Sequence, residues 1–307
     1  MGNLNVNTII FSGNTIFAGT GVYSGGQGVY ASTDNGNNWI QTSLNNRSVN
    51  SLLVNGNFIY AGTFQSLPNS GLYLSTNNGV NWSVSSNLGG IMTLAANGNN
   101  IFAGIYGFGG IYKSTDNGTT WSQTSLVNRS VIALAANGNY IFASCSSVGP
   151  FGEYGIFKST DNGTTWTLTS IPPHGYDAIA INGNNIYAGD GWPGTANGVF
   201  ISTDNGTSWT QTSLNNRDIN WLEISGNYIF AATNQYGVYV SSDNGQSWTQ
   251  QNDGLGSLDV SSICILNNYV FAGTGNSVWR RPIGQLTGMQ PYSNEAPNQF
   301  SLSQNYP

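Results

Sequence analysis

The sequence predicts an all-β fold, a seven-bladed β-propeller of four-stranded antiparallel blades, from two recurring strings and the turns between them. Self-similarity at a period of about forty residues is typical of propeller blades. The first string has the form Ser-Thr-Asp-Asn-Gly-x-x-Trp, and its Asp position falls at Asp34, Asn77, Asp116, Asp161, Asp204 and Asp243. The second has the form Gly-Asn-x-Ile-Phe-Ala-Gly, and its aromatic falls at Phe17, Tyr60, Phe102, Phe142, Tyr187, Phe230 and Phe271.

Each unit divides into four short strands, as the second unit illustrates. Its strands are expected at Asn50–Val54, Phe58–Thr63, Leu72–Ser75 and Trp82–Ser85. Asn-Gly between two alternating runs favours a hairpin, because the turn needs positive φ. The seventh unit lacks the first string, so its blade is either incomplete or completed by Gln285–Gln290 or by a segment preceding Met1. We place the propeller at residues 1–283.

Composition excludes several classes of partner. Charged residues make up 7% of the chain, and the formal net charge is −6. Seven Lys and Arg form no basic stripe for phosphates, which argues against nucleic acid. No run approaches ~18 apolar residues, so we expect no membrane insertion. Cys145 and Cys264 lie in different units and are expected to be unpaired, and one histidine with two distant cysteines predicts no metal site. We expect a monomer without a cofactor.

The first string, Ser/Thr-x-Asp-x-Gly-x-x-Trp, resembles the Asp-box or BNR repeat. That repeat occurs in sialidases, xyloglucan-cleaving propellers, sortilin-like receptors and photosystem II assembly factors. The resemblance implies a structural role for the six Asp and Asn positions, away from the active face of such propellers. An aspartate in this turn can accept hydrogen bonds from the backbone of its own turn, and the glycine takes positive φ. The tryptophan is expected to pack over the hairpin between blades.

The catalytic pattern of sialidases is not reproduced in this chain. No Arg-Ile-Pro segment occurs, and Arg280-Arg281-Pro282-Ile283 stands at the opposite end. Glycoside hydrolysis usually needs two carboxylates about 5–10 Å apart. Glu223 is the only glutamate on an expected innermost strand, where other units have Ile, Leu or Ala. It is therefore a candidate channel-lining residue, and a carboxylate centre around Glu223, Asp177, Asp190 or Asp218 is the alternative to a non-enzymatic protein.

The C-terminal eleven residues carry a second resemblance. Residues 297–307, Pro-Asn-Gln-Phe-Ser-Leu-Ser-Gln-Asn-Tyr-Pro, are similar to the opening of the C-terminal sorting domain of type IX secretion substrates. The resemblance implies export to the cell surface or medium of a Bacteroidetes-like bacterium. We therefore interpret residues 284–307 as a linker leading into a truncated sorting domain.

The loops between the second and third strands vary within an otherwise strict repeat, and such variation is where specificity is written. Their aromatic residues are Tyr23, Phe64, Tyr106, Phe108, Phe151, Tyr154, Trp192 and Tyr236. Phe64, Tyr106, Tyr154 and Trp192 are the candidates for stacking on a sugar or anchoring a peptide. The alternative is that these loops pack only on themselves.

The blade-to-blade connections add Arg47, Arg129, His174 and Arg217 at one repeated position. These side chains either bond nearby backbone carbonyls or form a cationic ring for a carboxylate-bearing ligand. Together with Glu223, they complete the candidate ligand-binding set.

We interpret the chain as a secreted or cell-surface binding or scaffold propeller, more consistent with a non-enzymatic role than with an enzyme. A glycan or peptide is the expected ligand, held on the face that carries the variable aromatic loops. The first alternative is a sialidase- or xyloglucanase-like glycoside hydrolase. The second is a structural surface-layer or filament subunit. Fold alone does not decide among them.

Overall fold

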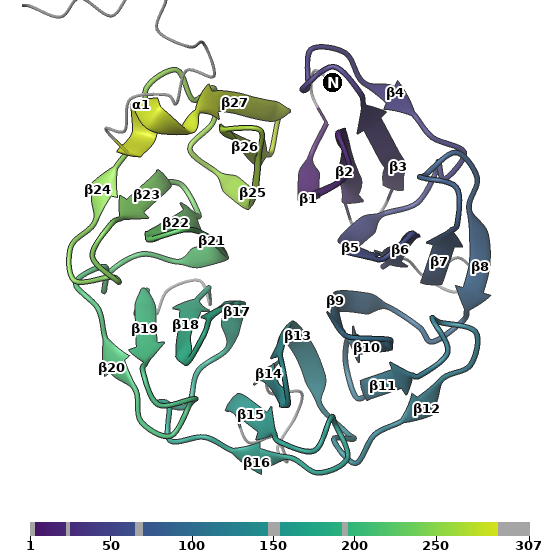
Figure 1. Cartoon of the computed structure of the whole chain (residues 1–307), viewed down its shortest axis with the longest axis horizontal. Helices are drawn as coiled ribbons and strands as arrows, with labels where there is room; N and C mark the ends of the chain where they lie inside the picture. The colour runs from purple at the N-terminus through teal and green to yellow at the C-terminus, as the bar shows by residue number, and fades with distance from the viewer. Residues whose placement is uncertain (1–3, 23–24, 65–69, 147–153, 192–195, 288–307) are drawn as a thin grey trace, which may run out of the picture.

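The computed structural model describes residues 4–22, 25–64, 70–146, 154–191 and 196–287, and these form a ring of seven antiparallel sheets around a central axis (Figure 1). The predicted β-propeller is confirmed. Blade 1 contains β1 (Val6–Ser12), β2 (Thr15–Val22), β3 (Gly25–Ser32) and β4 (Ile40–Gln41). Blade 2 contains β5 (Val49–Asn55), β6 (Phe58–Thr63), β7 (Gly71–Ser75) and β8 (Ser83–Ser86). Blade 3 contains β9 (Ile91–Asn97), β10 (Asn100–Ile105), β11 (Gly110–Ser114) and β12 (Ser122–Gln123).

The remaining blades repeat this order from the axis outwards. Blade 4 contains β13 (Ser130–Asn137), β14 (Tyr140–Ser146), β15 (Gly155–Ser159) and β16 (Thr167–Leu168). Blade 5 contains β17 (Tyr176–Asn182), β18 (Asn185–Asp190), β19 (Val199–Ser202) and β20 (Thr210–Gln211). Blade 6 contains β21 (Ile219–Ser225), β22 (Tyr228–Thr233), β23 (Gly237–Ser241) and β24 (Thr249–Gln250). Blade 7 contains β25 (Val260–Leu266), β26 (Tyr269–Thr274) and β27 (Val278–Pro282).

The seventh blade is three-stranded within the described residues. The segment that could have supplied its outer strand differs from expectation, because residues 285–287 belong to a short helix, α1 (Ile283–Thr287). Leu286 of that helix is buried in the cluster that contains Phe230 and Val260, between blades 6 and 7. The helix therefore adds apolar cover where the blade lacks the turn found in the other six.

The core is divided into seven clusters, and each joins two neighbouring blades. One of them places Val6 and Ile9 of blade 1 with Cys264 and Phe271 of blade 7, which closes the ring without exchange of a strand. Cys264 and Cys145 are both buried and unpaired, as expected.

The six Asp or Asn turns are closed by their own hydrogen bonds, as Asp116 illustrates. Its Oδ1 accepts hydrogen bonds from the backbone N–H of Thr119 and Thr120 and from the Ser114 hydroxyl. Trp121 Nε1 donates to the Gly118 carbonyl, 3.0 Å away. Asn77 accepts the equivalent backbone bond from Asn81.

These hydrogen bonds also affect the acidity of the aspartates. They lower the pKa of Asp34, Asp116, Asp161, Asp204 and Asp243 to about 2. Because the folded pKa lies below the unfolded value, the turns stabilise the fold above about pH 4 and lose this contribution as the pH falls towards 2.

Five of the six turn glycines lie against an aromatic side chain of the preceding blade, and the sixth, Gly245, lies against Thr212 instead. A Cβ at Gly79 of blade 2 would lie 2.4 Å from Phe17 of blade 1, and one at Gly163 would lie 2.7 Å from Phe102. The same contact crosses the ring closure, where Gly36 of blade 1 faces Phe271 of blade 7. These glycines combine φ near +80° with the absence of a side chain that would displace the ring. The two recurring strings are thus the two halves of one contact between blades.

Replacing Gly79 by Ala is expected to destabilise the protein more than the same change at Gly56. Both glycines have positive φ, which costs an alanine about 1–2 kcal/mol, but the Gly56 site has no neighbouring atom within 4 Å. Overpacking against Phe17 should add about 1–3 kcal/mol. Urea unfolding of the two variants measures the difference. Equal losses would contradict a role for the contact between blades.

Candidate functional site

A bulge near the start of every innermost strand forms a collar around the channel. The pairing register skips one residue there in each blade: Asn7, Asn50, Met92, Ile132, Asp177, Asn220 and Ser261. All seven skipped residues line one cavity of about 190 Å³. Bulges commonly re-aim a side chain beside a functional site. We call these seven residues the collar.

The wall of the channel changes character with depth. A second cavity, of about 260 Å³, shares Asn7, Asn50, Met92 and Ser261 with the first. It also includes Gly21 of β2 and Ser48 of the connection before β5. Further along the strands the first cavity is lined by Leu52, Leu94, Leu134 and Leu222. The collar is therefore the polar mouth of a channel that becomes apolar below it.

The collar opens on the face that carries the blade connections and the loops between second and third strands, here called the loop face. The two loop types are joined by backbone bonds, for example from Phe64 N–H to the Ser48 carbonyl and from Tyr106 N–H to the Gly90 carbonyl. The Asp and Asn turns contact the hairpins between first and second strands instead, as between Asn78 and Thr15. That opposite face is here called the turn face.

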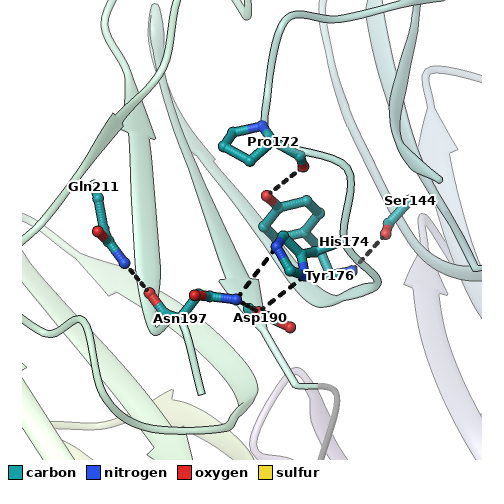
Figure 2. A network of polar contacts seen from close by, with 7 residues as sticks. All are labelled: Ser144, Pro172, His174, Tyr176, Asp190, Asn197 and Gln211. Carbon is teal, nitrogen blue, oxygen red and sulfur yellow. Dashed lines mark hydrogen bonds and ion pairs between the residues drawn. The ribbon is translucent and has the colours of Figure 1, made fainter. Parts of the chain in front are cut away.

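Blade 5 departs from the repeat at the loop face. The second strand carries a threonine at or near its end in four other blades, and the threonine hydroxyl donates to a carbonyl that closes the loop. In blade 5 this position is Asp190, whose side chain is fully buried. Asn197 Nδ2 donates to Asp190 Oδ2 at 2.7 Å, and His174 Nδ1 lies 3.8 Å from the same oxygen (Figure 2). The predicted His174 is thus paired with a buried carboxylate that the repeat does not have elsewhere.

The ring of Tyr176 completes this network. Figure 2 shows it beside His174, with its hydroxyl donating to the Pro172 carbonyl at 2.8 Å. Its backbone N–H donates to the Ser144 hydroxyl of blade 4. Burial, and the charge of Asp190 as a smaller cause, raise the pKa of Tyr176. The phenol is therefore a neutral hydrogen-bond donor that fixes the loop before β17.

Three of the four acids named in the enzymatic alternative converge beside this network. Burial first, and then the charges of Asp190 and Asp218, raise the pKa of Asp177 to about 6. Asp177 lies against the backbone of Gly191, yet its side chain is exposed to the channel. Burial and Asp190 also raise the pKa of Asp218, whose Oδ1 is buried and has no hydrogen-bond partner among the described residues. We call Asp177, Asp190 and Asp218 the acidic corner.

Glu223, the fourth acid, stands apart from the acidic corner. It lies further along β21, and Trp221 Nε1 donates to its Oε2 at 3.3 Å. Burial raises the pKa of Glu223 to about 7. Burial, and the charge of Glu223 as a smaller cause, raise the pKa of Cys264 in blade 7. The four acids that the sequence suggested as one carboxylate centre therefore separate into three aspartates at the channel mouth and one isolated glutamate.

The arginines at the repeated connection position are engaged with their own surroundings. Arg47 Nε donates to the Tyr73 hydroxyl and its Nη1 to the Asn46 carbonyl. Arg217 makes the same pair of bonds to Tyr239 and Asn216, and its guanidinium lies 4.1 Å from the centre of the Tyr236 ring. Arg129 lies over the ring of Phe157.

Several predicted aromatics lie exposed on the loop face. Phe64 and Tyr106 meet edge to face with ring centres 5.1 Å apart, and Tyr106 remains 54% exposed. Further exposed aromatics are Phe108, Tyr154 and Tyr236. Trp192, Tyr23 and Phe151 lie outside the described residues. Phe64 and Tyr106 thus form a platform between blades 2 and 3, across the channel mouth from the acidic corner (Figure 1).

No protein-family profile and no curated protein matches the sequence, but many solved structures share the fold. A GH74 xyloglucanase from Xanthomonas campestris matches with a TM-score of 0.74 and 14% identity, over 92% of this chain and 52% of that one. YCF48 bound to a D1 peptide matches with a TM-score of 0.68 and 17% identity, over 91% of this chain and 93% of that one. PorZ, a surface component of the type-IX secretion system of Porphyromonas gingivalis, matches with a TM-score of 0.68 and 16% identity. The match covers 92% of this chain and 47% of that one.

These likenesses define the class of the protein as a seven-bladed β-propeller. The chain spans about half the length of the xyloglucanase, and at these identities the shared feature is the fold. Within the described ranges, no group of three His, Cys, Asp or Glu side chains could hold a metal ion. No helix in those ranges is long and apolar enough to cross a membrane.

Replacing Glu223 by Gln is expected to stabilise the protein increasingly as the pH rises. The folded pKa of about 7 exceeds the usual 4.5, so ionisation costs the wild type stability between those values. Gln keeps an acceptor for Trp221 and has no charge to bury. Urea unfolding should show roughly 1–3 kcal/mol in favour of the variant at pH 8 and little difference at pH 4. A constant difference across this range would contradict the assigned burial of the carboxylate.

Proposed function

We propose that this chain is a binding or scaffold propeller that holds a glycan or peptide on its loop face. The observation that carries the proposal is the concentration of exposed aromatics, an open polar collar and a histidine beside a buried aspartate on that one face. Rigid exposed aromatics are common anchors in binding sites. The turn face, by contrast, uses its carboxylates within its own turns.

We further propose an extracellular or cell-surface location. The resemblance of residues 297–307 to a type IX sorting domain supports it. So does the fold of PorZ, which is described as a bacterial surface component, and of an extracellular domain from B. thetaiotaomicron. The six turns, which resemble Asp-box repeats, have a structural role in this proposal.

A glycoside hydrolase is the second candidate, and one observation favours it. Asp177 carries a raised pKa of about 6 at the channel mouth, beside two further carboxyl groups. A protonated acid beside an ionised one is the arrangement that glycosidic bond cleavage uses. The xyloglucanase among the structural neighbours shares the fold of this chain.

Binding is tested by screening the full chain on glycan and peptide arrays and then titrating the best ligand. Tyr106→Ala and Tyr154→Ala should each weaken it by a hot-spot amount, about 2 kcal/mol. Ile40→Ala is the matched control, because Ile40 is 75% exposed on the outer strand β4, away from the loop face. Unchanged affinity in both tyrosine variants, or loss in the Ile40 variant, would contradict the proposal. Release of reducing sugar from a bound glycan would instead establish the second candidate.

A further inference from the structure

The amide groups of the collar are oriented by the blades. Asn7 Nδ2 donates to the carbonyls of Gly21 and Val49, at 3.0 and 3.1 Å, and Asn220 Nδ2 donates to the Val260 carbonyl at 2.9 Å. Because the partners are carbonyl oxygens, the amides must turn their NH₂ groups towards the wall. Asn50 Nδ2 is likewise used, on the Met92 sulfur.

The collar offers a ligand several free acceptors. The Oδ1 atoms of Asn7 and Asn220 accept no hydrogen bond from any described residue, and neither is buried. Asp177 adds a carboxylate that has no hydrogen bond or ion pair within the described ranges. An unpartnered carboxylate with two open amide oxygens on the wall of the same cavity favours a group that only donates, and ammonium and guanidinium are such groups.

The charges around the mouth favour the same ligand. Asp190 at the end of β18 and Asp218 before β21 are the charged groups that act on Asp177, and both are acidic. His174, before β17, lies near Asp190. Arg217, on the same connection as Asp218, donates to the Tyr239 hydroxyl and the Asn216 carbonyl instead. The charges that act on Asp177 are therefore negative.

We propose that the collar receives the cationic side chain of a lysine or arginine from a bound peptide, with Asp177 as its ion-pair partner and the Asn7 and Asn220 carbonyls as further acceptors. The leucines below the collar stop the charged group at this depth, because an ion would lose its solvation among them. The aromatic platform of Phe64 and Tyr106 lies across the mouth for a neighbouring part of the peptide. This inference rests on the proposed binding function and chooses peptide over glycan.

The test uses the full chain and four acetylated, amidated pentapeptides, Gly-Ala-X-Ala-Gly, in which X is Lys, Arg, norleucine or Glu. Binding is followed by NMR, through the side-chain amide signals of Asn7 and Asn220. The Lys or Arg peptide should bind roughly tenfold or more tightly than the norleucine peptide, which has no charge, and the Glu peptide should be weakest. Affinity for the cationic peptide should fall as the pH drops from 7 to 5, because Asp177 becomes protonated.

Asp177→Asn should remove most of the advantage of the cationic peptide and leave norleucine binding unchanged. The variant should fold, because Asn7, Asn50 and Asn220 occupy the same position in other blades. Asp204→Asn on the turn face is the matched control and should change nothing, since Asn77 already occupies its equivalent.

Equal binding of norleucine and lysine peptides, no binding of any of them, or no effect of Asp177→Asn would overturn the inference. Asp177-dependent binding of a glucosamine oligosaccharide without binding of the Lys or Arg peptide would also overturn it. In each case the proposed binding function survives if the affinity for an array ligand still falls in the Tyr106→Ala and Tyr154→Ala variants. It fails separately if that dependence is absent.

Discussion

The contact between an aromatic ring of one blade and a turn glycine of the next is the interaction on which the rest of the structure depends. A propeller blade cannot bury both faces alone, so its stability comes from neighbours. Here the second strands of five blades supply a ring, and the next blade supplies a glycine with positive φ and no Cβ to displace it. Phe271 against Gly36 makes the same contact across the ring closure, between blades 7 and 1. Closure is therefore another copy of the repeat contact.

Because of this contact, the turn face keeps one geometry from blade to blade, whereas the loop face varies. On the turn face, aspartate, serine and tryptophan are all occupied in holding the turn that presents the glycine. On the loop face, the same end of a strand can be Thr20, which closes its loop, or Asp190, which binds Asn197 and faces His174. Substitutions there leave the contact between blades intact. We propose that this freedom is what the chain uses for binding.

The sequence was sufficient to predict the ring of blades because the signals for the blades are local. Asn-Gly turns, the spacing of the two strings and the unpaired cysteines each follow from neighbours in the chain or from the repeat period. The collar could not be predicted in the same way. Asn7 follows Val6 as any alternating strand residue would, and only the register reveals the bulge. A comparison of the seven units at that position offers the one available signal, because three of them have asparagine.

The three aspartates of the acidic corner were predicted as candidate residues, but their meeting at one position of the channel mouth was not predicted. Asp177, Asp190 and Asp218 come from a strand start, a strand end and a blade connection. The fold brings these three together and leaves Glu223 apart.

The outer strand expected at Gln285–Gln290 could not be judged from the repeat pattern alone. Residues 285–287 are helical, because Leu286 finds an apolar site near Phe230 that the repeat leaves uncovered.

The central claim is that one face holds the ring together and leaves the other free to bind. A crystal structure of the full chain with its tightest array ligand tests this most directly. The account predicts ligand density over the collar, within contact of the loops around Tyr106 or the acidic corner, and an unchanged set of contacts between aromatics and turn glycines. A ligand seated against the Asp and Asn turns, or along the outer strands, would contradict it.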